Sequence, residues 1–180
     1  EGNKWSFRIH VKGKDQLFGM RRFSIQHPKV RGFSGETLFM ETLRHVGVLA
    51  PRYFFVDVVI NGDSLGFMAL EEHFSKELLE FSGRREGVIL RYDESLLWDA
   101  RLRMGIESAD SIFHSFKNTE LDAFESSRIA NSPFLNENFA IAVGLLRSFA
   151  SGDLMPSEIF DFDLMGRYLA VVELLGSRHA

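Results

Sequence analysis

One hairpin pattern constrains the fold of this chain more than any other feature. Residues 53–72 read YFFVDVVINGDSLGFMALEE, with apolar runs at residues 53–60 and 65–70 on either side of an Asn61-Gly62 pair. Asn-Gly between β-branched and aromatic residues favours a type I′ turn, because both central positions of that turn need a positive φ. Apolar residues follow one another in the first run without strict alternation, which indicates that both faces of that strand are covered. We therefore expect an antiparallel strand pair at the centre of a domain.

The second strand of this hairpin ends on two carboxylates, Glu71 and Glu72. Such a pair is more often the polar end of a strand than a pair of catalytic acids, because a strand end commonly meets water. The residues alone indicate a site here only weakly, and both interpretations stay open.

Patterns before the hairpin add two strands and one main helix. Residues 4–12 (KWSFRIHVK) alternate like a half-buried strand, and residues 17–26 (LFGMRRFSIQ) predict a second strand antiparallel to it. Residues 36–46 place their apolar side chains on one helical face. Ser34 is the expected N-cap of this helix and Gly47 the expected glycine just beyond its end.

After the hairpin the pattern changes from strands to helices. A short helix at residues 74–81 and a strand at 87–92 precede a segment with helices expected at residues 120–130, 135–150 and 164–175. Asp161 or Asp163 is the expected cap of the last helix. We therefore predict an α+β fold with a β-rich domain at residues 1–92 and a helical domain at 93–180.

Composition excludes several classes of protein. The chain has no cysteine, which excludes disulfides, thiolate zinc sites and cysteine nucleophiles. The formal net charge of −4 argues against broad nucleic-acid binding. No apolar run approaches the roughly 20 residues that span a bilayer. The chain opens without an initiator Met or a signal peptide, so we expect a piece of a longer protein.

Two polar features outside the hairpin could carry chemistry. Arg21-Arg22 lies on a predicted strand and is either a solvated strand edge or an anion contact, because guanidinium groups match phosphate oxygens. Glu36 lies in the first turn of the main helix, where a carboxylate is favourable to the helix dipole. Kinases, however, hold nucleotide phosphates with a strand cation paired to a helix carboxylate. Neither a Rossmann fingerprint nor a P-loop is present.

Several stretches together resemble one known family. They are NKWSFRI from Asn3, LFGMRRFSI from Leu17, ETLFMETLRHVGVLAPR from Glu36, FVDVVINGDSLGFMALEEHF from Phe55 and FDFDLMGRYLAVVELLGSRHA from Phe160. The pattern of a helix ending in G-[VLI]-x-x-P, a strand, an N-G turn and G-x-[YF]-x-L-x-E is met at Gly47, Val48, Pro51, Asn61, Gly62, Gly66, Leu70 and Glu72, with Met68 at the aromatic position. This pattern is similar to that of the spore-coat-protein-H (CotH) kinase family, which has an atypical protein-kinase-like fold.

The resemblance implies a fold and a function. It implies an antiparallel β-sheet N-lobe with one main helix, followed by a truncated helical C-lobe portion, with ATP and Mg²⁺ or Mn²⁺ as cofactors. It assigns Arg21, Arg22, Glu36 and Glu72 to nucleotide binding, with Glu72 at the inter-lobe hinge, and His179 to the start of the catalytic loop. The metal-binding residues of the family follow that histidine, so the catalytic and metal residues are expected beyond Ala180. Because those residues lie beyond Ala180, the chain by itself is expected to be inactive as a kinase. The expected substrate is a protein Ser or Thr of a spore coat or cell envelope, which implies an extracellular location.

Departures from the family pattern favour a second hypothesis. Gly35 stands where the family has a basic residue, and the strand positions that could supply a lysine hold arginine. Arginine does not reproduce the compact point charge of lysine. The alternative is therefore a catalytically silent relative that serves as an extracellular binding or structural module.

Overall fold

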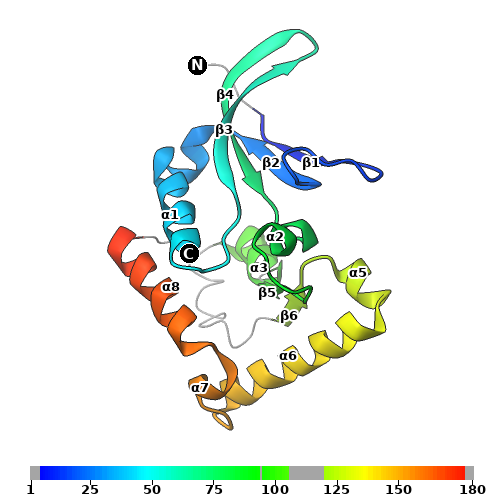
Figure 1. Ribbon diagram of the computed structural model, residues 1–180, viewed down its shortest axis with the longest axis vertical. Helices are drawn as coiled ribbons and strands as arrows, with labels where there is room; N and C mark the ends of the chain where they lie inside the picture. The colour runs from blue at the N-terminus through cyan, green and yellow to red at the C-terminus, as the bar shows by residue number, and fades with distance from the viewer. Residues whose placement is uncertain (1–4, 94, 106–119, 177–180) are drawn as a thin grey trace. The chain divides into compact units, whose positions relative to one another are not determined.

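The computed structural model describes residues 5–93, 95–105 and 120–176 (Figure 1). The chain separates into two compact units, residues 1–86 together with 160–180, and residues 87–159. These units differ from the predicted division at residues 92 and 93, because the last helix packs on the main helix of the first unit. The architecture is α+β, with a four-stranded antiparallel sheet in the first unit.

The sheet of the first unit has the strand order β1-β2-β4-β3, and all neighbours in it are antiparallel. Its strands are β1 (Phe7–His10), β2 (Arg22–Gln26), β3 (Tyr53–Ile60) and β4 (Asp63–Glu72). The β3–β4 turn has φ angles of 53° at Asn61 and 91° at Gly62, which confirms the predicted requirement for positive φ at both positions.

β4 is the more completely covered strand of the hairpin. Met68, Ala69 and Leu70 are consecutive and all buried, so both faces of β4 are covered there. Val59 near the end of β3 is 64% exposed. The prediction that both faces of the first hairpin strand are covered is therefore confirmed only for residues 53–56, which are buried or half-buried, and is wrong for the outer part of β3, the edge strand of the described sheet.

The first two strands are shorter than their sequence patterns predict. A tight turn at residues 17–20 replaces the start of the predicted second strand, with positive φ at Phe18 and Gly19. The backbone N–H and C=O groups of Leu17 and Met20 bond each other at 2.9 Å in both directions. This turn buries Met20 completely against Phe23 of β2.

The main helix, α1 (Ser34–His45), follows a short 3₁₀ helix, η1 (Pro28–Arg31). Its N-cap is Phe33, so the prediction of Ser34 as the cap is wrong by one residue; the cap makes no side-chain hydrogen bond. Gly47 has a φ of 82°, as expected for a glycine that follows a helix end.

Two more helices belong to the first unit, α2 (Lys76–Phe81) and α8 (Phe162–Leu175). Asp161 caps α8 by accepting a hydrogen bond from the backbone N–H of Leu164 at 3.1 Å, which confirms one of the two predicted caps. Figure 1 shows α8 running beside α1. Their shared core contains Phe39, Leu43, Ala50 and Val171.

The second unit combines a two-stranded sheet with helices. Its elements are β5 (Leu90–Asp93), α3 (Ser95–Met104), β6 (Glu120–Ala123), α5 (Ser126–Ala130), α6 (Pro133–Ser151) and α7 (Pro156–Ile159). The prediction of a helix over residues 120–130 is wrong in its first part, because β6 pairs there with β5. The long helix predicted at residues 135–150 is confirmed as α6.

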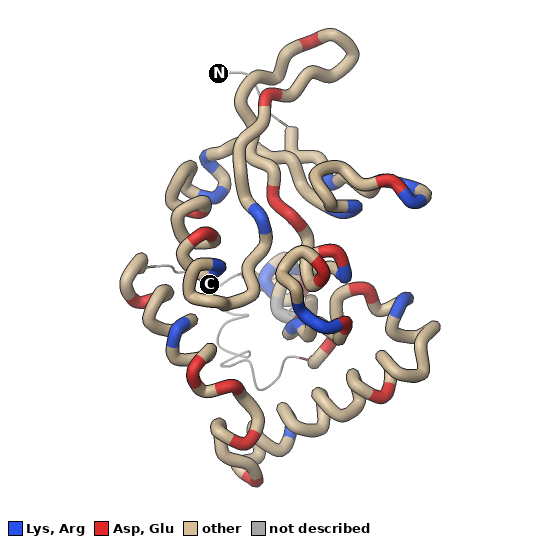
Figure 2. The backbone as a smooth tube through the Cα atoms, in the orientation of Figure 1, with Lys and Arg blue, Asp and Glu red and all other residues tan. Residues whose placement is uncertain are grey.

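Figure 2 shows acidic but no basic positions in the outer part of the β3–β4 hairpin, where Asp57 and Asp63 lie. None of the helices in the described ranges is both long and apolar enough to cross a membrane.

A matched pair of glycine substitutions tests the hairpin turn. A Cβ added at Gly62 or at Gly144 would meet no atom within 4 Å, but only Gly62 has a positive φ. We expect Gly62→Ala to lower the free energy of unfolding by about 1–2 kcal/mol, because a left-handed backbone is unfavourable with a side chain. Gly144→Ala inside α6 should raise it by up to about 1 kcal/mol. Denaturant unfolding measures both, and shifts of the same sign would contradict the assignment.

Candidate functional site

The two faces of the four-stranded sheet differ in chemistry. Residues that pair directly across antiparallel strands point to the same face, and successive residues alternate between faces. Ser24, Glu71 and Tyr53 lie opposite one another on β2, β4 and β3. We call the face that carries them the polar face. The other, apolar face carries Phe23 opposite Glu72. The two consecutive glutamates at the end of β4 therefore point to opposite faces.

Glu72 is held by an ion pair on the apolar face. It is only 2% exposed, and an unpaired carboxylate there would be strongly unfavourable. Arg52 donates from Nη2 to Oε1 at 2.6 Å and from Nε to Oε2 at 2.8 Å. The backbone N–H of Arg52 also donates to Oε2, at 3.1 Å. This fork-shaped geometry satisfies both carboxylate oxygens.

The same guanidinium ties further segments to the sheet. Arg52 Nη1 donates to the carbonyl of Phe18 at 2.6 Å, and Nη2 lies 3.3 Å from the carbonyl of Gly19. The guanidinium carbon lies 4.0 Å from the centre of the Phe81 ring at the end of α2. The side chain of Glu72, predicted at a nucleotide-binding hinge, is thus engaged in holding β4, the 17–20 turn and α2 together.

Glu71 organises the polar face. Its Oε2 accepts a hydrogen bond from Gln26 Nε2 at 2.6 Å, and its Oε1 accepts one from Arg31 Nη2 at 3.2 Å. Beside it, Ser24 Oγ lies 2.7 Å from Nε2 of His73, the residue that follows β4. Burial lowers the pKa of His73 from its ordinary value, and the positive charges of Arg8 and Arg22 add to this effect, against the opposing charge of Glu71.

Tyr53 places a buried phenol on the polar face. The residue is 1% exposed, and its hydroxyl has no hydrogen-bond partner within the described part of the chain. Burial raises its pKa to about 12, with contributions from the negative charges of Glu36 and Glu71. Of these two carboxylates, Glu36 belongs to α1 and Glu71 to the polar face of β4.

The structure separates the predicted strand cations. Arg22 belongs to β2 and points to the polar face, because it lies two residues before Ser24. Arg21 precedes the strand, and its Nη2 donates to the carbonyl of Gly13 at 2.6 Å in the β1–β2 loop. His179, the predicted start of a catalytic loop, lies outside the described residues.

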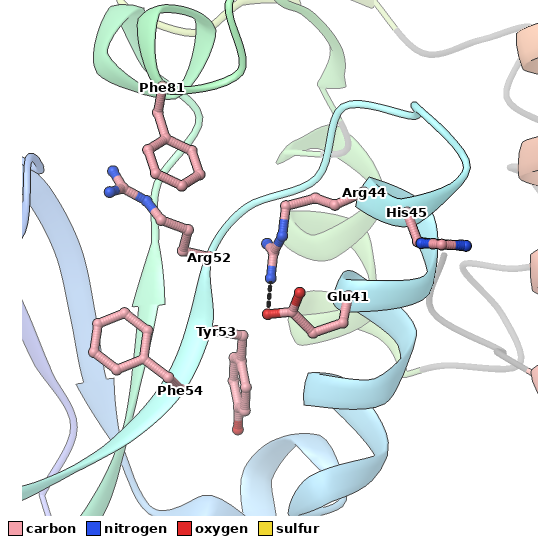
Figure 3. A pocket seen from close by; sticks show the side chains of 7 residues that line it. All are labelled: Glu41, Arg44, His45, Arg52, Tyr53, Phe54 and Phe81. Carbon is pink, nitrogen blue, oxygen red and sulfur yellow. Dashed lines mark hydrogen bonds and ion pairs between the residues drawn. The ribbon is translucent and has the colours of Figure 1, made fainter.

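A pocket of about 540 Å³ opens beside the start of β3 (Figure 3). One of its two arginines, Arg44, donates to the carbonyl of Pro51 at 2.6 Å and pairs with Glu41, as the dashed line shows. The lining consists of Glu41, Arg44, His45, Arg52, Tyr53, Phe54 and Phe81. None of the predicted nucleotide-binding residues Arg21, Arg22, Glu36 and Glu72 lines it.

Sequence reasoning missed Arg52, Ser24 and His73. No local pattern marks Arg52, because its partner lies twenty residues away. Ser24 could have been found from the alternation of β2, which places it on the same face as Arg22. Within the described ranges, no group of three or more His, Asp or Glu side chains is placed to hold a metal ion.

Comparisons with known proteins add no family assignment. No protein-family model matches the chain, and no curated protein matches it.

Breaking the buried ion pair should destabilise the chain strongly. We expect Arg52→Met to lower the free energy of unfolding by about 3–5 kcal/mol, because it leaves the buried Glu72 carboxylate without its positively charged partner. The double variant Arg52→Met/Glu72→Met should lie closer to the wild type than the single variant does. Lys76→Met, in the exposed Lys76–Glu80 pair, is the control and should cost less than about 1 kcal/mol. Equal losses in Arg52→Met and Lys76→Met would contradict this role.

Tyr53 should make stability depend on pH above 10. The folded chain keeps the phenol neutral until its pKa of about 12, whereas the unfolded chain loses the proton near the ordinary value of 10.0. The free energy of unfolding should therefore fall by roughly 2 kcal/mol more in the wild type than in Tyr53→Phe as the pH rises between these values.

The same variant tests whether the hydroxyl is unpartnered. Tyr53→Phe should leave stability at pH 7 unchanged or higher, because it removes a buried polar group that makes no hydrogen bond. Tyr168→Phe, at the partly buried tyrosine of α8, is the control and should leave stability at pH 7 unchanged. A loss of stability at pH 7 confined to Tyr53→Phe would show that the hydroxyl has a partner.

Proposed function

We propose that this chain forms the nucleotide-binding part of a CotH-like atypical protein kinase, which transfers phosphate from ATP to protein Ser or Thr. The observation that carries the proposal is a cation on the polar face of the sheet together with a helix carboxylate whose charge acts on a tyrosine of that face. Arg22 points to the polar face, and Glu36 of α1 acts electrostatically on Tyr53 of that same face. Kinases use a strand cation and a helix carboxylate of this kind to hold nucleotide phosphates.

The chain order around these two residues also supports the proposal. The strand with Arg22, β2, directly precedes η1 and α1, and the β3–β4 hairpin follows α1. In protein kinases the phosphate-binding cation likewise lies on a strand and its carboxylate partner on a helix. Arg22 is favoured over Arg21 because it lies within β2 and points to the polar face, whereas Arg21 precedes the strand.

The backbone at the end of β4, where the resemblance implies the hinge, is fixed by two hydrogen bonds. The N–H of Glu72 donates to the carbonyl of Arg52 at 2.9 Å, and the N–H of His73 donates to the carbonyl of Arg22 at 3.1 Å. Glu72 would thus contribute to a nucleotide site through the position of its backbone, since its carboxylate is bound to Arg52.

The proposed cofactors are ATP, whose phosphates need a cationic contact, and a divalent metal ion. Arg22 fits the phosphate part, because a guanidinium pairs well with phosphate oxygens. ATP would arrive with Mg²⁺ or Mn²⁺, which neutralise charge during phosphoryl transfer. The family resemblance puts the metal ligands after His179, and it also suggests a coat or envelope protein as substrate and an extracellular location.

A silent binding module remains the second candidate, and one observation favours it. The cation on the polar face of β2 is arginine, which spreads its charge over a planar group and is a poor substitute for a lysine point charge. In this reading the fold would bind a partner without transferring phosphate.

A ligand-induced shift of stability tests nucleotide binding. ATP with Mg²⁺ or Mn²⁺, at a hundred times its dissociation constant, should raise the free energy of unfolding of the protein by about 2.7 kcal/mol. Arg22→Ala should abolish the shift, because it removes the phosphate contact. Arg103→Ala, on α3 of the second unit, is the matched control and should retain the shift.

Phosphoryl transfer separates the two candidates. A protein that combines this chain with the metal ligands expected after His179 should label an acceptor protein with radioactive ATP, and Glu36→Ala should reduce this labelling strongly. Binding without labelling would favour the silent module. A chain that shows neither a shift nor labelling, in wild type and Arg22→Ala alike, contradicts the kinase proposal.

A further inference from the structure

Ser24 and His73 form a nucleophile-and-base pair that nucleotide binding does not require. Ser24 Oγ lies 2.7 Å from Nε2 of His73. The backbone also fixes the pair, because the N–H of His73 donates to the carbonyl of Arg22, two residues before Ser24. When Nδ1 carries the ring proton, Nε2 accepts the hydrogen of the Ser24 hydroxyl. A hydroxyl that donates to a neutral imidazole is the arrangement of an activated serine.

The imidazole is kept in its neutral form by its surroundings. Burial lowers the pKa of His73 from its ordinary value, and the positive charges of Arg8 and Arg22 lower it further, which favours the neutral ring. The opposing charge of Glu71 is offset, because Gln26 and Arg31 both donate to its carboxylate. His73 is therefore able to take a proton.

The groups around Ser24 also suit an anionic product. Arg8 lies directly opposite Ser24 on β1, and Arg22 points to the same face from β2. His10 lies opposite Arg22 on β1 and adds a further titratable group to this face. Guanidinium groups form strong hydrogen bonds with phosphate, so a phosphoryl group on Ser24 would lie among positive charges.

We infer that Ser24 is a phosphoryl-acceptor site, modified by a phosphoric anhydride donor with His73 as the base. Ser24 Oγ attacks the terminal phosphorus of the donor and forms an oxygen–phosphorus bond. The anhydride oxygen–phosphorus bond breaks, and the leaving group departs with the electron pair. The hydroxyl proton moves to Nε2 of His73. The product is a phosphoserine beside an imidazolium and two guanidinium groups.

Two donors of this class distinguish the source of the phosphoryl group. Acetyl phosphate is small and does not require a nucleotide site, and acetate is then the leaving group. ATP with Mg²⁺ would reach Ser24 from the nucleotide site. Of the two experiments, only the one with ATP therefore rests on the proposed function. Labelling by acetyl phosphate but not by ATP would support the inference and count against the nucleotide site.

The experiment measures phosphoryl incorporation into the whole chain by intact-mass spectrometry, with the modified residue located in peptides. Ser24→Ala should abolish incorporation. His73→Gln, which keeps a hydrogen-bonding amide but no base, should slow it by about 100-fold. Ser64→Ala, at a serine of β4 whose hydroxyl accepts only a backbone N–H in the described structure, and His45→Gln on α1 are controls and should retain the wild-type rate.

The pH dependence separates a base from a structural hydrogen bond. The wild-type rate should fall as the pH drops through the pKa of His73, with a midpoint below the ordinary value for histidine, and the rate of His73→Gln should lack this transition. Three outcomes would overturn the inference: no incorporation from either donor, equal incorporation in Ser24→Ala, or an unchanged rate and pH profile in His73→Gln.

Discussion

The buried ion pair between Arg52 and Glu72 is the constraint on which the first unit depends. Alternation along β4 turns Glu72 toward the apolar face, where a carboxylate without a partner would be costly. Arg52 meets both oxygens and in addition reaches the carbonyl of Phe18 and the ring of Phe81. One guanidinium thereby connects the start of β3, the end of β4, the 17–20 turn and α2. A hydrophobic pair could fill the same volume, but it could not bond the turn carbonyls.

This ion pair lies on the apolar face of the sheet, whereas the candidate functional groups lie on the polar face. Because Glu72 is committed to the apolar face, its neighbour Glu71 points to the polar face and bonds Gln26 and Arg31 there. The end of β4 is thus anchored on the apolar face by Arg52 and on the polar face by the bonds of Glu71. Ser24, His73 and Arg22 lie together at this end of the β2–β4 pair because β2 pairs with β4, and not because they are close in sequence.

The proposed kinase function and the silent module share this polar face. Both need a stable sheet, and both benefit from a rigid strand end at Glu72. The kinase proposal requires that Arg22 replace the lysine point charge and that metal ligands follow His179. The silent module requires neither. The Ser24–His73 pair belongs to the same face but depends on a different chemistry, that of a hydroxyl beside a neutral base. A single face of β2 therefore carries both a candidate phosphate contact and a candidate phosphoryl acceptor.

Much of the fold could be predicted from local sequence because local rules decide turns, caps and amphipathic helices. The Asn61-Gly62 turn, the cap at Asp161, the glycine at position 47 and the long helix α6 all follow from conformational preferences of a few adjacent residues. The same rules could not show that residues 120–123 form a strand, because that strand exists through its pairing with β5 across about thirty residues.

Only the tertiary structure decided which strand is covered and which charges meet. The inner part of β4 is buried on both faces, and it is the part that pairs with β2 as a second neighbour. No pattern within the hairpin predicts which of its two strands pairs with β2. No sequence pattern indicates that Arg52 pairs with Glu72 or that Ser24 bonds His73. Alternation along a strand predicts the face to which a side chain points, but not which residue lies opposite it on the neighbouring strand. The sequence by itself therefore determined the hairpin and the residue types at its end. Long-range strand pairing determined that one terminal glutamate is a buried anchor and the other part of a polar face.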